Sequence, residues 1–206
     1  MMKILIVTGG IGSGKSLVCR ILTDKYGIPV YEADSRVKAL YSEMPQMLED
    51  IEDTLGHSFR NGYGEFVAKK LADVIFTDKS ALHKVEEILF PYLKEDFSIW
   101  AEKQGKGVVA FESATVLEKP MFDGFGDMVL LVDAPVELRL KRACSRDRLE
   151  ESRVMDRMAA QPLMNQLSEG GRCDRVDHTI VNDSDLDSLY EKLGYFIEKY
   201  ELTKML

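Results

Sequence analysis

The chain has 206 residues, of which 45% are apolar, and its formal net charge at pH 7 is −8. Such a chain can form one compact domain with a sizeable core, and its acidic balance disfavours general binding to nucleic acid or to a membrane surface. The three cysteines lack a CxxC spacing, so we expect thiols in a reducing cytoplasm and no disulfide scaffold. We expect no signal peptide or membrane span, because the first apolar run is short. The three histidines, at positions 57, 83 and 178, lack the spacing of a metal site and are expected on the surface or in loops.

The first thirty residues predict a strand, a helix and a second strand. Lys3–Val7 is a short β-branched run that suits a buried strand. Apolar residues recur at helical spacing over Lys15–Tyr26, and Gly27 is a natural helix stop. Ile28–Tyr31 is expected to form the second strand.

The rest of the chain alternates in a way that is typical of a parallel sheet. Residues 34–100 have an almost entirely helical pattern, with breaks expected near 44–45, at 56–64 and near 77–78. Further strands are predicted at Val108–Phe111, Met128–Val132 and Thr179–Val181, with helices after the second and third of these. Strands separated by helices imply an α/β fold with helices on both faces of the sheet. The helical stretch is too long for a simple crossover, so we expect it to form a subdomain.

The segment TGGIGSGKS, residues 8–16, lies between the first predicted strand and the first predicted helix. Gly9, Gly14, Lys15 and Ser16 satisfy the phosphate-loop pattern GxxxxGK[ST]. Glycines let successive N–H groups point inward as an anion cradle, and the following helix adds its positive end. The alternative is a glycine-rich turn without a ligand. The correct flanks favour a site for a nucleoside triphosphate, with Lys15 spanning the terminal phosphates and Ser16 ligating Mg²⁺.

Other features of the sequence indicate what kind of enzyme would use the triphosphate. The chain has no Asn-Lys-x-Asp segment, which a switch GTPase would use to read its base, and it is short for an ATP-driven motor. A small-molecule kinase needs an acceptor site, a group that orients or deprotonates the acceptor hydroxyl, and cations that cover the phosphates. The sequence offers candidates for each.

Carboxylates mark the acceptor side. Glu32 and Asp34 follow the second strand, and in extended chain they would share one face. Asp34 could instead be an N-cap for a helix that starts at Ser35, and Glu32 a solvated surface carboxylate. Glu112 ends the next predicted strand at the same edge of the sheet.

Arginines supply the candidate cations. Six of the eleven lie between Arg139 and Arg157, and Arg142 and Arg146 are four residues apart, hence on one helical face. With Gln161 behind them they are typical of a lid over phosphates. A salt-bridged surface helix would have a similar pattern, because acidic residues are interleaved with the arginines.

These motifs together resemble the dephospho-coenzyme A kinase family. The match runs in order over most of the chain: TGGIGSGKS, Glu32-Ala33-Asp34, Leu55-Gly56, LADVIF at 71–76, ILFPYL around Pro91, Phe111-Glu112, Arg142, Arg146-Asp147, Arg157, Gln161, Asp177 and Ile180–Asn182. The resemblance implies a P-loop NTPase fold of three α/β/α layers, similar to the nucleoside monophosphate kinases. It implies one domain, 1–206, with a core (1–33, 105–138, 162–206), a helical acceptor-binding subdomain (34–104) and a lid (139–161).

The implied reaction moves the γ-phosphate of ATP to the ribose 3′-hydroxyl of dephospho-coenzyme A, in the cytoplasm, as the last step of coenzyme A synthesis. Lys15, Glu32 and Arg142 would be catalytic, with Glu32 as the base and Ser16 on Mg²⁺. ATP would be held by Gly10, Ile11, Gly12, Ser13, Gly14, Lys15, Ser16, Leu17, Arg142, Arg146 and Asn182. The acceptor would be bound by Glu32, Asp34, Phe90, Pro91 and Glu112. We expect a monomer or a weak homo-oligomer, with no nucleic-acid or membrane partner.

Three positions depart from the family pattern, all on the acceptor side. Glu32 stands where the family usually has Asp, Phe90 where it has His, and Ala68 where an Arg would be expected, with Lys69 and Lys70 adjacent. Lysine supplies charge without the two-point grip of a guanidinium. If the longer Glu32 is misplaced, Asp34 must take the role of the base. The alternatives are therefore a related kinase with another acceptor, or a nucleotide-binding homologue that no longer catalyses.

Overall fold

The computed structural model describes residues 2–202, and its centre is a five-stranded sheet in the order β2-β3-β1-β4-β5. Every neighbouring pair of strands is parallel. The strands are β1 (Lys3–Thr8), β2 (Val30–Glu32), β3 (Val108–Glu112), β4 (Met128–Asp133) and β5 (His178–Val181). The predicted α/β class with a parallel sheet is therefore confirmed.

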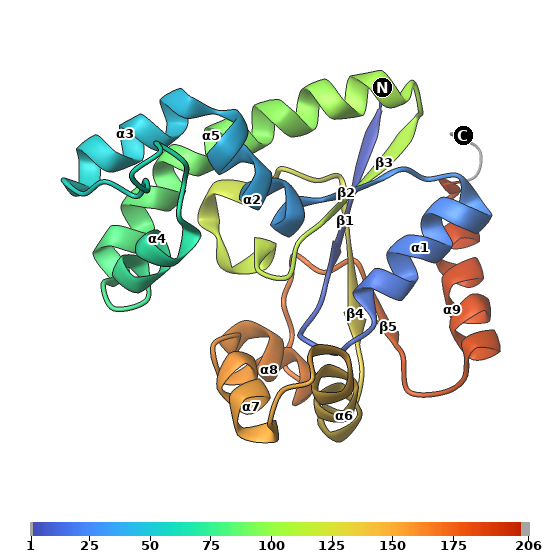
Figure 1. Ribbon diagram of the computed structural model, residues 1–206. Coiled ribbons are helices and arrows are strands. Elements are labelled where there is room, and N and C mark those ends of the chain that lie inside the picture. The colour runs from blue at the N-terminus through green and yellow to red at the C-terminus, as the bar shows by residue number, and fades with distance from the viewer. Residues whose placement is uncertain (1, 203–206) are drawn as a thin grey trace. The chain divides into compact units, whose positions relative to one another are not determined.

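Nine α-helices and two short 3₁₀ helices connect the strands within the described part of the chain (Figure 1). The α-helices are α1 (Lys15–Tyr26), α2 (Ala33–Glu43), α3 (Pro45–Leu55), α4 (Ala68–Ile75), α5 (Lys79–Gln104), α6 (Val136–Asp147), α7 (Glu151–Ala159), α8 (Pro162–Ser168) and α9 (Leu186–Lys199). The 3₁₀ helices are η1 (Val116–Glu118) and η2 (Pro120–Phe122). The three breaks expected in the long helical stretch are confirmed, since helices end or begin at each of them.

The chain divides into two compact units. A sheet unit contains residues 2–32 and 104–202, and a helical unit contains residues 33–103. The sheet unit holds the phosphate-loop segment.

One face of the sheet is covered by α1 and α9, which lie side by side in Figure 1. Leu5 and Val7 of β1 point to this face and join a continuous apolar cluster with Leu22 of α1 and Phe196 of α9. Alternate residues of a strand point to opposite faces, so this packing fixes which residues of β1 face the other way. Gly27 ends α1 with a φ of 62°, as its sequence position predicts.

The other face of the sheet carries an aromatic cluster within the sheet unit. The ring of Phe111 on β3 lies 5.6 Å from that of Phe122 and 5.1 Å from that of Phe125. Tyr31 of β2 stacks on the same phenyl ring at 5.6 Å. Such offset and edge-on pairs add to the burial of apolar surface. The cluster anchors the irregular segment between β3 and β4 to the sheet.

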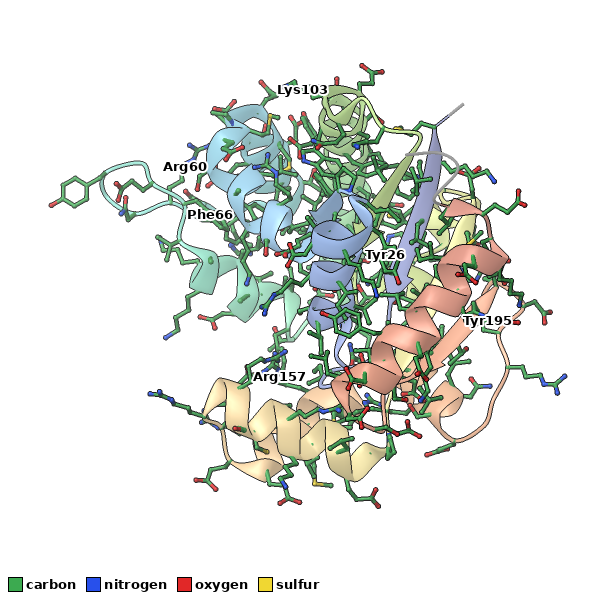
Figure 2. All side chains as sticks on the ribbon, turned by 90° about the vertical axis from the view of Figure 1, so that its right-hand side faces the viewer. Tyr26, Arg60, Phe66, Lys103, Arg157 and Tyr195 are labelled. Carbon is green, nitrogen blue, oxygen red and sulfur yellow. The ribbon has the colours of Figure 1, made fainter. Side chains whose placement is uncertain are left out.

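The helical unit consists of α2 to α4 and most of α5. The 26-residue α5 continues through Pro91, although proline removes one N–H donor from the helix. Arg36 of α2 binds Asp96 of α5 through two hydrogen bonds, of 2.8 and 3.0 Å. In the loop between α3 and α4, Arg60 and Phe66 form an isolated antiparallel bridge (Figure 2).

Two local predictions were wrong. Helix α2 begins at Ala33, so Asp34 lies in its first turn and is neither its N-cap nor part of an extended chain with Glu32. His178 was expected on the surface or in a loop, but it is the first residue of β5 and is half-buried against the rings of Phe196 and Tyr200. Among the described residues no helix has the length and apolar character needed to cross a membrane.

Candidate functional site: a phosphate loop at the carboxyl edge of the sheet

The segment between β1 and α1 folds into a tight loop that depends on glycine. Gly9, Gly12 and Gly14 have φ values of 151°, 78° and 101°, in a region that residues with a Cβ rarely adopt. The N–H of Ser13 donates to the carbonyl of Gly10 at 3.1 Å, which closes a turn inside the loop. Gly14 is the N-cap of α1, so the positive end of the helix dipole faces the loop.

The two glycines that the phosphate-loop motif requires are also sterically necessary. A Cβ on Gly9 would lie 2.0 Å from the carbonyl oxygen of Val132, and a Cβ on Gly14 would lie 2.2 Å from Nδ2 of Asn182. The loop therefore rests directly on the end of β4 and on the residue that follows β5. A side chain at either glycine would push the loop away from the sheet.

Two hydroxyl groups of this segment are buried without a protein partner. Thr8 and Ser13 are each 0% exposed, and neither Oγ atom has a hydrogen-bond partner among the described residues. Buried polar atoms are nearly always satisfied, so such atoms beside a nest of main-chain N–H groups are typical of a site that binds a polar ligand.

Lys15 and two glutamates come together at the carboxyl ends of three strands. Nζ of Lys15 lies 3.8 Å from Oε1 of Glu112, and the two side chains are only 12% and 13% exposed. Glu32 and Glu112 are register partners at the ends of β2 and β3. The structure thus places the predicted ammonium and two of the predicted carboxylates at one edge of the sheet.

Asn182 is bound on three sides. Its Nδ2 donates to the carbonyl of Ser13 at 2.9 Å, and its main-chain N–H donates to the carbonyl of Asp133 at 2.7 Å. Its own carbonyl accepts a 3.0 Å hydrogen bond from Nη1 of Arg142. The resemblance implies an ATP contact for Asn182, and the structure gives it a second task, which is to support the phosphate loop.

The predicted lid arginines lie on α6 and α7, which pack together in the sheet unit. Nε and Nη2 of Arg146 donate to the carboxylate of Asp147 at 2.7 and 3.1 Å, and Nη1 of Arg157 donates to the same group at 2.6 Å. The hydrogen bond from Arg146 is the largest cause that lowers the pKa of Asp147 to about 2, and the one from Arg157 adds to it. Arg157 projects from α7 in Figure 2.

Gln161 and Arg139 also contact the loop. Oε1 of Gln161 accepts a 3.0 Å hydrogen bond from the main-chain N–H of Ile11. The N–H of Ile11, which was predicted to bind ATP, is therefore bound to a side chain of the protein in the structure. Nε of the buried Arg139 donates to the carbonyl of Ile11 at 3.0 Å. Sequence reasoning included Arg139 only as the first arginine of the lid. A cluster of exposed and paired arginines gives no signal that one of them is buried.

Other predicted residues lie elsewhere. Asp177 caps the opposite end of the sheet, because its Oδ2 accepts from the N–H of Val129 at 2.7 Å. Phe90 and Pro91 lie within α5 of the helical unit, where Phe90 is buried, and Ala68 is the exposed first residue of α4. The thiol of Cys19 on α1 has a pKa raised mainly by burial and then by Glu112, which argues against a nucleophilic role.

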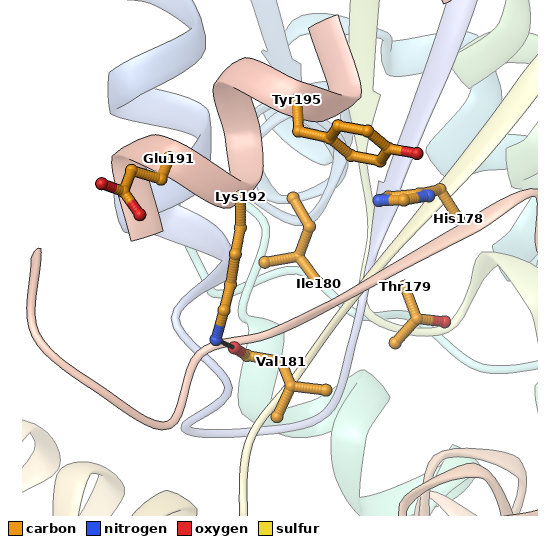
Figure 3. Close-up of a pocket in the computed structure, with 7 residues that line it drawn as sticks. All are labelled: His178, Thr179, Ile180, Val181, Glu191, Lys192 and Tyr195. Atoms are coloured by element: carbon orange, nitrogen blue, oxygen red, sulfur yellow. Dashed lines mark hydrogen bonds between the residues drawn. The ribbon is translucent and has the colours of Figure 1, made fainter. Parts of the chain in front are cut away.

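A pocket of 450 Å³ along β5 and α9 contains none of the predicted site residues. It is lined by His178, Thr179, Ile180, Val181, Glu191, Lys192 and Tyr195 (Figure 3). Nζ of Lys192 crosses one end and donates to the carbonyl of Val181 at 2.7 Å. In the described residues no group of three or more histidine, cysteine or carboxylate side chains is placed to hold a metal ion.

Comparison with known proteins settles the family. The CoaE family model, described as dephospho-CoA kinase, matches residues 3–188. The chain belongs to the dephospho-CoA kinase family. Dephospho-CoA kinase of Porphyromonas gingivalis is 37% identical over 177 residues, which cover 85% of this chain and 84% of that protein. The family predicted from the motifs is therefore confirmed, and with it a kinase that uses a nucleotide.

Solved structures agree with a dephospho-CoA kinase fold. TT1252 from Thermus thermophilus superposes with a TM-score of 0.80 at 25% identity and covers 96% of this chain and 97% of its own. Dephospho-CoA kinase from Campylobacter jejuni gives a TM-score of 0.65 at 22% identity over the full length of both chains, which shows the same fold. Membership of the family favours dephospho-CoA kinase activity over the alternatives of a drifted acceptor or a lost activity.

Proposed function

We propose that this chain transfers the γ-phosphate of ATP to the ribose 3′-hydroxyl of dephospho-CoA, which yields CoA and ADP. The observation that carries the proposal is a phosphate loop that leads into Lys15 at the start of α1, with the carboxylates of Glu32 and Glu112 at the ends of two neighbouring strands. The family supplies the acceptor, because the site residues by themselves support only a polyphosphate ligand and a carboxylate that could take up a proton.

The phosphate loop would hold the triphosphate. Main-chain N–H groups of Gly12, Gly14, Lys15 and Ser16 and the positive end of α1 would stabilise the phosphate oxygens, and Lys15 would add a mobile ammonium. The transition state of phosphoryl transfer spreads negative charge over the transferred group, so fixed positive groups around it lower the barrier. Arg142 and Arg146 would cover the phosphates from α6.

Mg²⁺ fits this site as a cation shared with the substrate. Ser16 follows Lys15 at the start of α1 and is exposed, so its hydroxyl would be available to hold the ion. Mg²⁺ in kinases usually keeps several waters and has few protein ligands, so one hydroxyl would be enough to hold it beside the phosphates. The ion would neutralise charge on the transferred phosphoryl group.

Glu32 would accept the proton of the 3′-hydroxyl. Two adjacent carboxylates repel each other, and Lys15 neutralises Glu112 because their charged atoms are 3.8 Å apart. Glu32, at the end of β2, is the carboxylate that we propose as the base. The alternative base is Asp34 in the first turn of α2.

The helical unit would bind the acceptor through Asp34, Phe90 and Pro91. The departures from the family at Ala68 and Phe90 remove one cation and one polar group from this unit. Lys69 and Lys70 lie beside Ala68, and Nζ of Lys70 donates to the carbonyl of Arg60, so Lys69 is the better replacement cation. These changes predict weaker binding of the acceptor and leave ATP binding unchanged.

The enzyme would act as a monomer or weak homo-oligomer in the cytoplasm. The three cysteines are unpaired thiols, which agrees with a reducing compartment.

The test is an ADP-release assay with purified protein, ATP, Mg²⁺ and dephospho-CoA, with the product identified by mass spectrometry. We expect turnover to CoA that is lost in Lys15→Ala. Turnover only with other hydroxylated acceptors would overturn the assignment of the acceptor. ATP binding without turnover on any acceptor would overturn the assignment of a catalyst.

A further inference from the structure

We infer that Arg139 is a positioning residue of the phosphate loop, and that it acts through Ile11 and Gly10 without touching the phosphates. The inference rests on the proposed function, because it concerns how the same loop is held in its ATP-binding shape. It assigns a role in nucleotide binding to a side chain that the sequence analysis grouped with the arginines of the lid.

Arg139 is a buried cation. Its side chain is 0% exposed, and burial lowers the pKa of its guanidinium, which nearby Asp133 partly offsets. Arginine is almost never fully buried unless it is paired. Nη1 donates to Oγ of Ser168 at 2.8 Å and lies 3.8 Å from Oδ1 of Asp133, and Ser168 donates to that carboxylate at 2.9 Å. The carboxylate therefore holds one end of the guanidinium.

The other side of the guanidinium faces the phosphate loop. Nε donates to the carbonyl of Ile11 at 3.0 Å, which turns this carbonyl toward α6 and away from the nest. A carbonyl that pointed inward would repel phosphate oxygens, so its direction decides whether the loop is a good anion site. The N–H of Ile11 is bound to Gln161, and its side chain packs against the cluster of Ala143, Val154 and Met158. Residues from α6, α7 and the start of α8 thus fix Ile11 in position.

Nη2 of Arg139 points at Gly10 and has no hydrogen-bond partner among the described residues. A Cβ on Gly10 would lie 2.0 Å from Nη2, and a Cβ on Gly12 would lie 2.1 Å from the main-chain oxygen of Arg139. The phosphate-loop motif requires glycine at neither position. The side chain of Arg139 therefore leaves no room for a Cβ at position 10, and its main chain leaves none at position 12. The guanidinium also places a positive charge directly behind the loop.

The test is calorimetric titration of ATP with Mg²⁺ into the full chain, which needs no turnover and no acceptor. In Arg139→Met, which keeps an apolar side chain of similar length, we expect the dissociation constant for ATP to rise about tenfold or more, as expected for loss of a charged hydrogen bond. The KM for dephospho-CoA should stay within about twofold. A purely structural role would instead lower the active fraction, and hence kcat, at unchanged affinity for ATP.

A double-mutant cycle tests the contact with Gly10 directly. Gly10→Ala should weaken ATP binding in the natural background and cost far less when combined with Arg139→Gln, whose shorter side chain leaves room for the methyl group. Gly12→Ala is the matched control. Its clash is with the main chain of Arg139 and its φ is 78°, so Arg139→Gln should not rescue it.

The outcomes distinguish a failure of the proposed kinase function from a failure of the role inferred for Arg139. Absence of ATP binding by the natural chain would overturn the proposed function and this inference together. Unchanged ATP affinity in both Arg139→Met and Arg139→Gln, with binding intact in the natural chain, would overturn the inference alone. If Arg139→Met does not fold, the cycle with Arg139→Gln decides, because equal costs of Gly10→Ala in both backgrounds would contradict the contact.

Discussion

The ammonium of Lys15 lies 3.8 Å from a carboxylate oxygen of Glu112, although the two residues are almost a hundred positions apart in the chain. Glu112 ends β3, next to β1 in the sheet, so the pairing of these strands brings the phosphate-loop lysine to a carboxylate. The carboxylate holds the ammonium at the edge of the sheet where the phosphates would bind.

Lys15→Ala should nearly eliminate phosphoryl transfer and leave the fold intact. The substitution removes the only cation of the loop segment, residues 8–16, while the main-chain contacts of the loop remain. ADP release measures the activity, and circular dichroism measures the fold. Lys25→Ala, at the other end of α1, is the control and should keep normal turnover. Near-normal turnover in Lys15→Ala would contradict the role of this lysine.

Glu32→Gln should lower kcat far more than it changes the KM for ATP. General-base assistance is typically worth about 10²–10⁴ in rate, and an amide cannot accept the proton. Steady-state kinetics on both substrates measures the split. Asp34→Asn tests the alternative base, and Glu112→Gln tests the carboxylate that lies beside Lys15. If Asp34→Asn abolishes kcat and Glu32→Gln leaves it intact, the base has been assigned to the wrong residue.

Asn182→Asp should destabilise the protein and weaken ATP binding. The change places a carboxylate oxygen against the carbonyl of Ser13, where the amide now donates at 2.9 Å. Loss of a buried hydrogen bond with an unsatisfied group left behind costs about 1–3 kcal/mol of unfolding free energy. Urea denaturation and ATP titration measure the two effects.

Asp183→Asn is the control for Asn182→Asp. Asp183 is exposed and pairs with Lys192, and exposed ion pairs contribute at most about 1 kcal/mol. The adjacent substitution should therefore leave ATP affinity unchanged. Equal effects of the two variants would rule out a special role for the contact between Asn182 and Ser13.

The stability that Asp147 contributes should depend on pH in the acid range. Its pKa is about 2 in the folded chain against an ordinary value of 3.8, mainly because of the hydrogen bond from Arg146. A lowered folded-state pKa means that the contribution is complete above about pH 5 and is lost as the pH falls through 3.8 toward 2. The difference in Tm between the natural chain and Asp147→Asn should therefore be largest near neutral pH and shrink on acidification.

Calorimetry from pH 7 to pH 3 measures this difference. A Tm gap for Asp147→Asn that stays constant over this range would contradict the contribution of the ion pairs. A gap that widens in acid would contradict its sign.

The elements and the phosphate loop were predictable because their signals are local. The motif needs only its own nine residues and its flanks, and each predicted strand lies within two residues of an observed one at either end. Asp34 was misplaced because an acidic residue suits both an N-cap and a first helical turn, and the choice depends on where the backbone turns helical.

Arg139 was beyond sequence reasoning for a different reason. The other charged residues of α6 are exposed or half-buried, and only the close approach of α6 to the phosphate loop buries the guanidinium at this position. The contact with Ile11 joins residues 128 positions apart. Periodicity over a single helix carries no information about such a partner.

The outermost strands, β2 and β5, have three and four residues, and Lys192 covers one of the carbonyls of β5. A long, unprotected edge strand can pair with a strand of another chain and start aggregation, whereas a short edge strand covered by a charged side chain does not. The protein should therefore stay dispersed at high concentration, and Lys192→Val should promote its aggregation.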